Sequence, residues 1–172
     1  MTQPFSQFAQ NNYYVNPPRW SGYSTAGEAL SFSSGETDPT VTANWKSPST
    51  NVVSDNGDLV HLFDYTINPG SVTYIGEEPI ILDCLGITSA ESSANNTELR
   101  FQWAKNGIPS GTRYLYQNIA NGNDIISLPS MITYTLETGD YVDFFFNADK
   151  ACTITIQNAE WKVRAVASDY TP

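Results

Sequence analysis

The chain has 172 residues, with eight Lys and Arg against eighteen Asp and Glu, and its formal net charge at neutral pH is −10. Eight scattered basic residues form no cluster that could neutralise a phosphate backbone or an anionic membrane surface, so we expect neither nucleic acid nor membrane as a partner. Charged residues make up only 15% of the chain, against roughly 25% in an average protein. The surface must therefore consist largely of hydroxyl, amide and aromatic groups.

Residues 1–57 are rich in Asn, Ser, Thr, Pro and Gly, and they also carry isolated aromatic residues. A disordered tail would contain fewer aromatics, so we expect an extended N-terminal arm that orders by laying aromatic side chains on another surface. That surface is either the chain's own domain or a partner, and we expect the docking residues to be Tyr13, Tyr14, Trp20 and Tyr23. No basic residue precedes Arg19 and no apolar run occurs there, so no secretion signal is expected.

Residues 58–172 carry strand signals throughout. No window keeps a 3.6-residue apolar period over three turns, and glycines and prolines punctuate the chain, which indicates an all-β domain. The expected strands cover residues 58–66, 71–75, 79–85, 99–104, 113–119, 125–136, 141–147, 151–157 and 159–167. The polar stretch 88–97 is expected to be a loop. This many short strands, spaced by turns, predict an antiparallel β-sandwich or jelly roll.

The last third of the chain alternates most regularly, so its inward faces can be assigned. Two apolar sets are expected to face the core: Val142, Phe144 and Phe146, and Cys152, Ile154 and Ile156. On the strand 141–147, Tyr141 and Phe145 point to the opposite face. A monomeric sandwich normally keeps that second face polar, so we expect it to be covered.

Two turn motifs give this pattern a family likeness. Lys105-Asn106-Gly107 ends an apolar strand, and Asn-Gly is a strong hairpin signal. About thirty residues later the chain reads L-x-x-G-D-x-V, in which Gly139 and Asp140 form the turn, and the last strand reads A-x-W-x-V-x-A-V. The arrangement resembles the TNF-like jelly-roll superfamily, which also contains the heads of complement-type proteins and trimeric domains of bacteriophage virions.

The resemblance spans about Leu59 to Ala167 and implies a homotrimer in which apolar side chains of one sheet face meet near a three-fold axis. It makes Tyr141 and Phe145 the expected interface residues, whereas the alternative is that the arm covers that face. Neither collagen triplets nor heptads precede the domain, unlike in the animal members. This departure favours a viral structural protein.

Candidate catalytic and metal-binding residues are few. His61 is the only histidine, which argues against cupin-type metal sites and serine hydrolase triads. The acidic pairs Glu77-Glu78 and Asp140/Asp143 lie in a turn and at a strand start, and we expect no catalytic role for either. We expect no metal and no cofactor, although calcium binding by the turns 55–58 and 121–124 stays open. Whether Cys84 and Cys152 pair also stays open.

We therefore expect a non-enzymatic bacteriophage virion protein, made in the host cytoplasm and displayed on the particle exterior. As a trimeric jelly roll it would serve as a capsid decoration or head-fibre protein, attached through the arm to the major capsid protein or another virion protein. The alternative is a receptor- or glycan-binding head of a tail fibre or tail tip. There Tyr114, Tyr116 and Tyr170 could stack on the sugar rings of a host surface glycan. A jelly-roll hydrolase or isomerase is the weakest reading.

Overall fold

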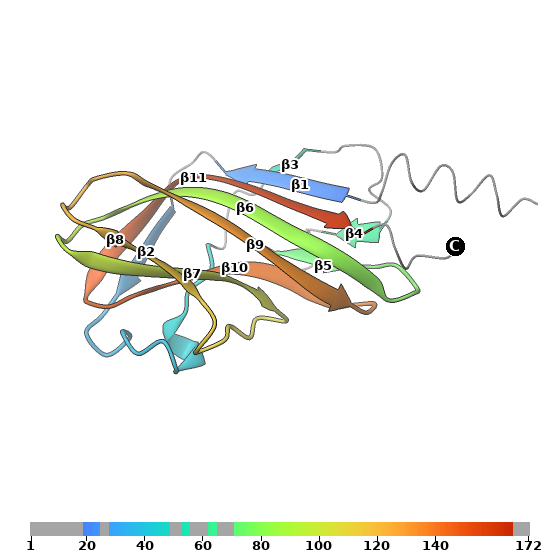
Figure 1. The fold of residues 1–172 in the computed structure, drawn as a ribbon, viewed down its shortest axis with the longest axis horizontal. Helices are drawn as coiled ribbons and strands as arrows, with labels where there is room; N and C mark the ends of the chain where they lie inside the picture. Colours follow the sequence, from blue (N-terminus) through green and yellow to red (C-terminus); the bar gives the residue numbers. More distant parts are fainter. Residues whose placement is uncertain (1–18, 25–27, 49–52, 56–61, 65–70, 167–172) are drawn as a thin grey trace, which may run out of the picture.

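The structure is a computed structural model that describes residues 19–24, 28–48, 53–55, 62–64 and 71–166, and it confirms an all-β sandwich of two antiparallel sheets (Figure 1). The first sheet has the strand order β3-β1-β11-β6-β9, and β2 also pairs with β11. Its strands are β1 (Arg19–Ser24), β2 (Glu28–Phe32), β3 (Val53–Asp55), β6 (Ile80–Ser92), β9 (Ile126–Leu136) and β11 (Cys152–Ala165). The second sheet has the order β4-β5-β10-β7-β8. Its strands are β4 (Phe63–Asp64), β5 (Val72–Tyr74), β7 (Thr97–Lys105), β8 (Leu115–Ile119) and β10 (Tyr141–Ala148).

The core lies between the two sheets and follows from the period-2 alternation of the strands. Both inward sets expected from the sequence are confirmed, because every one of their side chains is buried: Val142, Phe144, Phe146, Cys152, Ile154 and Ile156. Phe144 lies at the centre of an aromatic cluster, with its ring centroid 5.2 Å from that of Trp103 and 5.1 Å from that of Phe146. Both contacts are edge-to-face, the geometry that aromatic quadrupoles favour.

The loop expected over residues 88–97 is wrong for its first half, because β6 continues through Ser92. Thr88 and Ser92 are buried inside the sandwich, which their polar side chains did not suggest. Their hydroxyls are bonded there: Trp161 Nε1 donates to Thr88 Oγ1 at 3.3 Å, and Ser92 Oγ lies 2.9 Å from Thr97 Oγ1. A buried hydroxyl with a partner is compatible with a strand, so side-chain polarity alone placed the end of this strand too early.

The two strands expected over 151–157 and 159–167 form one strand, β11, so their separation at Asn158 is wrong. The pairing with β6 shifts register between Ile156 and Asn158, which is a β-bulge. One extra residue resets the alternation, so that Ile156 and Ala159 both face the core. The strand expected over 58–66 is described only at residues 62–64, where β4 lies.

The strands within the expected arm belong to the first sheet. β1 pairs with residues 159–164 of β11, β2 pairs with residues 152–156 of the same strand, and β3 pairs with β1. Trp20 lies opposite Val163 and Tyr23 opposite Glu160, whereas Tyr13 and Tyr14 lie outside the described residues. The docking role of these four residues stays a prediction.

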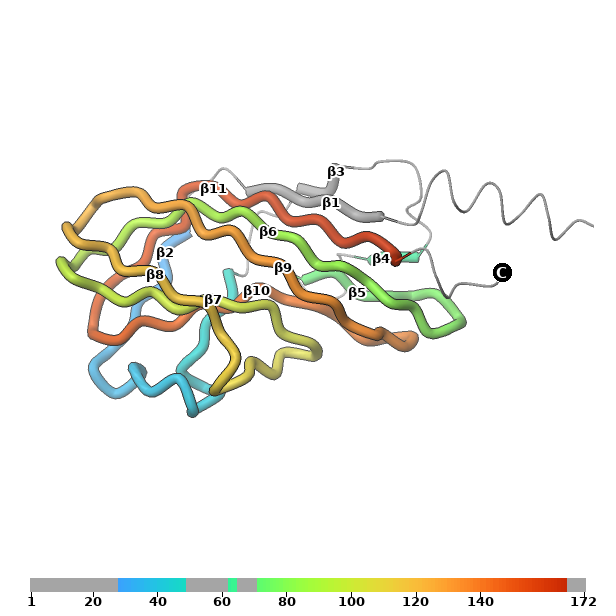
Figure 2. Tube along the Cα trace, in the orientation of Figure 1, coloured from blue at the N-terminus to red at the C-terminus, as the bar shows by residue number. Residues whose placement is uncertain are grey.

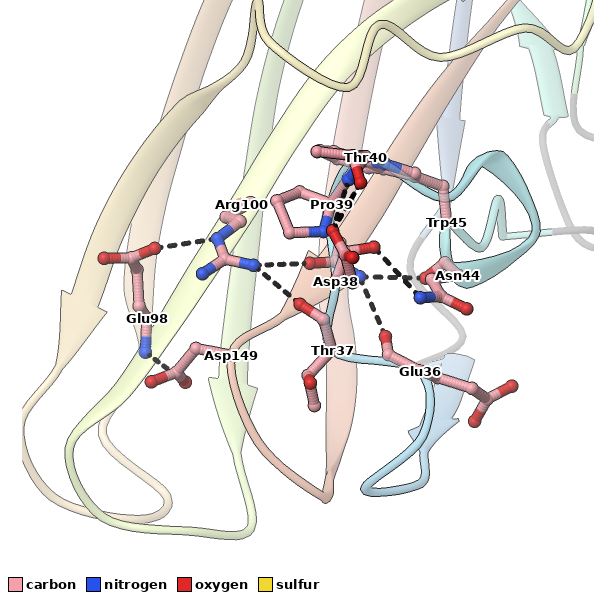
Figure 3. Close-up of polar contacts among 11 residues, drawn as sticks. Glu36, Thr37, Asp38, Pro39, Thr40, Asn44, Trp45, Glu98, Arg100 and Asp149 are labelled. Atoms are coloured by element: carbon pink, nitrogen blue, oxygen red, sulfur yellow. Dashed lines mark hydrogen bonds and ion pairs between the residues drawn. The ribbon is translucent and has the colours of Figure 1, made fainter.

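Residues 33–48, called the strap below, follow β2 and cross to the second sheet, where they run along the side that faces away from the first (Figure 2). The backbone of Lys46 exchanges two hydrogen bonds with that of Phe146, of 2.9 and 2.8 Å. Arg100 donates through Nη1 to the Thr37 carbonyl at 2.8 Å and through Nε to Glu98 Oε1 at 2.7 Å (Figure 3). The strap also contains the short helix η1 (Thr42–Asn44).

The two turn motifs meet at one end of the second sheet. Asn106 Nδ2 donates to Asp140 Oδ1 at 2.7 Å, and the Tyr141 amide donates to Asn106 Oδ1 at 2.9 Å. Lys105 Nζ lies 2.6 Å from Asp140 Oδ2. Partial desolvation raises the pKa of Asp140, but these hydrogen bonds and the Lys105 charge outweigh it and lower the pKa to about 2. Together these contacts hold the start of β10 against the end of β7.

Gly107 is the position in this turn where a side chain is least tolerated. Its φ is +67°, and a Cβ would lie 2.8 Å from the Tyr141 hydroxyl oxygen. We expect Gly107→Ala to lower the free energy of unfolding by about 1–2 kcal/mol, measured by urea titration. Gly35→Ala is the matched control, because its nearest atom would be 4.0 Å from the new Cβ. Equal losses in both variants would contradict the turn argument.

Candidate functional site: an apolar patch on the first sheet

The outer face of the first sheet carries apolar side chains where β6 pairs with β9. Leu85 lies opposite Met131, and Ile87 lies opposite Pro129. Directly opposed residues of an antiparallel pair share a face, so these four side chains form one cluster. Pro129 is tolerated because β9 is an edge strand, where a missing N–H need not break a ladder.

Leu115, at the start of β8, extends this cluster from the second sheet. Leu85, Ile87, Leu115, Pro129 and Met131 are named the apolar patch, and they surround a shallow hollow of about 410 Å³. Ile87 is 56% exposed, Met131 70% and Leu115 49%. A group of large apolar side chains held open to solvent around a hollow is typical of an interaction surface.

Toward β11 this face also carries charged side chains. Arg164 Nη2 lies 3.3 Å from Asp83 Oδ2, and Lys162 Nζ lies 2.5 Å from Glu160 Oε1. The patch therefore has an apolar centre and a charged border on one side. This is the usual distribution of polarity in a protein interface.

Sequence reasoning did not find this patch. It pointed to Tyr141 and Phe145 on β10, which the structure leaves half-buried on the second sheet. The interface role of these two residues stays a prediction. The signal for the patch is present in β6, where apolar residues occupy both parities: Ile80, Leu82 and Cys84 face inward, and Leu85 and Ile87 face outward.

The outer face of the second sheet near Tyr141 and Phe145 is largely covered. Asn147, Gln102 and Ala104 point to that face and are all buried. Asn147 Nδ2 donates to the carbonyls of Glu36 and Asn44, and Gln102 Nε2 donates to the Ser110 carbonyl. The strap and the loop before β8 thus cover much of this face.

The described candidate catalytic and metal-binding residues form no catalytic or metal site. Among the described residues, no group of three or more His, Cys, Asp or Glu could hold a metal ion. Asp140 is engaged by Lys105 and Asn106, while Asp143 is buried on β10. His61 lies outside the described residues.

The turn at residues 121–124 and the two cysteines have structural roles in the described part of the chain. Asn121 Nδ2 donates to Asp124 Oδ2 at 2.9 Å, an ordinary turn contact, and residues 56–58 of the other acidic turn lie outside the described part. Cys84 and Cys152 are buried free thiols. Burial raises the pKa of Cys84 to about 12, with a smaller effect from Asp83, so its thiol is unreactive.

Two of the three expected sugar-stacking tyrosines, Tyr114 and Tyr116, are described, and both lie beside Arg100. Tyr114 packs against Trp45 with ring centroids 5.6 Å apart, and its ring also receives the Arg100 guanidinium at 5.7 Å. Tyr116 is exposed on β8, and Tyr170 lies outside the described residues.

Within the described part of the chain, no helix is long and apolar enough to span a membrane.

The strand order and the sheet pairing define a C1q/TNF-like jelly roll. Domains of this fold are typically trimeric and typically non-enzymatic.

Solved structures with this fold include the globular domain of zebrafish complement 1qA, 14% identical, which covers 91% of this chain and 100% of its own, with a TM-score of 0.52. The PRD1 vertex protein P5 is 8% identical and covers 86% of this chain and 96% of its own, with a TM-score of 0.51. Eiger TNF from S. frugiperda is 8% identical and covers 91% and 98%, with a TM-score of 0.50. No protein-family model and no curated protein sequence matches the chain.

Proposed function

We propose that this protein is a structural component of a bacteriophage particle. It forms a homotrimeric jelly roll displayed on the particle exterior as a capsid decoration or head-fibre protein, and its N-terminal residues attach it to another virion protein. The observation that carries the proposal is the apolar patch, an exposed surface on a fold whose domains are typically trimeric. The similarity to a phage vertex protein supports the location on a particle.

The apolar patch is the surface through which the subunits of this trimer meet. Burying Ile87, Met131 and Leu115 against a second copy removes apolar area from water, which contributes roughly 25 cal/mol for each Å². The ion pairs Arg164–Asp83 and Lys162–Glu160 lie on the β11 side and stay near the rim, where charges cost little to keep solvated. A second copy is the occupant because the domains of this fold typically trimerise.

The first test of the proposal is the oligomeric state. Native mass spectrometry of the 19.0 kDa chain is expected to show a species of about 57 kDa. Ile87→Asp and Met131→Asp each place a charge in the patch and are expected to weaken assembly by at least about tenfold in concentration. Ile108→Asp is the matched control, since Ile108 is 68% exposed but does not line the hollow. A stable wild-type monomer would contradict the proposed trimer. Equal weakening of assembly by the control variant would show that the patch is not the interface.

The second test is location. Antibodies raised against the chain are expected to label purified particles in immuno-electron microscopy. A chain that lacks residues 1–18 retains every described strand and is expected to trimerise but to lose attachment. Particles that carry no label, or a shortened chain that attaches as well as the full chain, would contradict the proposed role.

A further inference from the structure

A second hollow, called the slot below, opens at the edge of the sandwich between β8 of the second sheet and β9 of the first. Its volume is about 290 Å³. Phe101 and Trp103 of β7 line it on one side, and Ser130 and Ile132 of β9 line it on the other. The slot shares Leu115, Ser130 and Met131 with the hollow of the apolar patch, so the two are neighbours.

Two of the residues that line the slot carry buried polar atoms without partners. Trp103 Nε1 and Ser130 Oγ are the buried side-chain polar atoms that form no hydrogen bond within the described part of the chain. Trp103 is only 4% exposed, so its N–H cannot be well solvated. The indoles of Trp45 and Trp161, by contrast, both donate, to the Pro39 carbonyl and to Thr88 Oγ1. A buried donor without an acceptor is costly and calls for a functional explanation.

Gly86 explains how these two atoms come to lie in the same region. A Cβ at Gly86 would lie 3.1 Å from Ser130 Oγ and 3.3 Å from Trp103 Cζ2. Ser130 and Trp103 therefore both approach the Gly86 backbone closely, and even a Cβ at this position would be tightly packed. The Ser130 hydroxyl and the Trp103 ring thus approach the same backbone position, and both residues line the slot.

Arg113 adds a charged donor. It lines the slot just before β8, is exposed, and its guanidinium has no hydrogen bond or ion pair with any described residue. Five other basic side chains are paired with carboxylates: Lys46, Arg100, Lys105, Lys162 and Arg164. None of the acidic residues in the described part of the chain lines the slot. The slot thus offers donors and a positive charge in an otherwise acidic protein.

We propose that the slot binds a small organic carboxylate with an apolar body, such as an aromatic or branched aliphatic acid. The carboxylate oxygens accept hydrogen bonds from Arg113, from the Ser130 hydroxyl and from the Trp103 indole. The apolar body lies against Leu115 and Met131. A volume of about 290 Å³ is at the low end for ligand sites and suits a molecule of the size of benzoate.

A single chain supplies all three donors, whereas Leu115 and Met131 also belong to the apolar patch that is proposed to meet a second copy. Because the slot adjoins the apolar patch, a bound acid would lie beside the proposed subunit interface. The experiment can therefore be carried out on the wild-type protein in whichever oligomeric state it adopts, with that state measured on the same samples.

The probe is benzoate, followed by the indole N–H signals of ¹⁵N-tryptophan-labelled protein in NMR spectra. We expect benzoate to shift the Trp103 signal, assigned with Trp103→Phe, and to leave the signals of Trp45 and Trp161 in place, since those two N–H groups already have acceptors. Benzamide lacks the charge and acetate lacks the apolar body, so both are expected to bind at least about tenfold more weakly. Equal binding of all three compounds, or no shift of the Trp103 signal, overturns the proposal.

Three variants locate the site. Arg113→Gln is expected to weaken benzoate binding about tenfold or more, and Ser130→Ala by about threefold to tenfold. Lys150→Gln removes the same charge from the turn between β10 and β11, outside the slot, and is expected to change binding less than twofold. Equal losses in the three variants overturn the proposal. Binding of benzoate to monomeric Ile87→Asp protein but not to the wild type would also overturn the proposal. That result would mean that a neighbouring subunit fills the slot in the assembled protein.

Discussion

Asn147→Ala is expected to lower the free energy of unfolding by about 3 kcal/mol and to release the strap from the second sheet. Asn147 is fully buried. Its Nδ2 donates to the carbonyls of Glu36 and Asn44, both at 3.0 Å, and its Oδ1 accepts from Arg100 Nη1 at 3.0 Å. An alanine removes the donor to the Glu36 and Asn44 carbonyls and one of the acceptors of Arg100, and each lost bond adds to the loss.

Urea titration measures the stability loss, and hydrogen exchange measures the release. The amides of Lys46 and Phe146, which bond each other's carbonyls, should lose protection in the variant. Asn147→Asp is a second variant that keeps the shape but loses both donated bonds, so it should behave similarly. Asn118→Ala, in an exposed position of β8, is the matched control and should cost less than about 0.5 kcal/mol. If the Lys46 amide kept its protection from hydrogen exchange in the variant, Asn147 would not be the residue that holds the strap on the second sheet.

The strap illustrates what the sequence pattern does not reveal. Arg100 and Asn147 are polar residues that the strand alternation places on the outer face of the second sheet. Nothing in their spacing indicates that another segment of the chain covers them. Their partners are backbone carbonyls 63, 111 and 103 residues away along the chain. Backbone carbonyls are the same in every residue type, so such contacts leave no signature in the composition of residues 33–48.

The elements predicted correctly are those fixed by local rules. Alternation placed Val142, Phe144 and Phe146 in the core, and Asn106-Gly107 marked a turn that the structure shows with positive φ at both residues. The errors arose where tertiary pairing overrides local polarity, as at Thr88 and in the bulge of β11. The apolar patch was missed because apolar residues of both parities in β6 look like a strand buried on both faces.

Asp143→Asn is expected to remove a pH dependence from the stability of the protein. Asp143 is buried on the outer face of β10, where it lies opposite Ala104. Desolvation raises the pKa of its carboxyl to about 7, and a hydrogen bond with Ser71 only partly opposes the rise. At pH 5 this carboxyl is neutral in the folded protein and ionised in the unfolded chain. The chain therefore takes up a proton when it folds.

The sign of the effect follows from this proton. The folded protein binds it more tightly than the unfolded chain, whose carboxyl has a pKa near 3.8, so the contribution of Asp143 to stability is greatest at low pH. It falls as the pH rises from about 4 to about 7, by up to about 1.4 kcal/mol for each pH unit. The asparagine variant cannot ionise, so it should match the wild type within about 1 kcal/mol at pH 4 and exceed it by about 2–4 kcal/mol at pH 8.

Urea titrations at pH 4, 6 and 8 measure the difference between the variant and the wild type. That difference should grow with pH because only the wild type loses the bound proton, whereas a constant difference would mean that the Asp143 carboxyl is already ionised in the fold. Asp124→Asn removes the same charge from the turn between β8 and β9 and serves as the control for net charge. The proposed subunit interface lies on the other sheet, so the measured oligomeric state should be the same for the Asp143→Asn variant and the wild type at each pH. This makes the stability difference a property of the fold around Asp143.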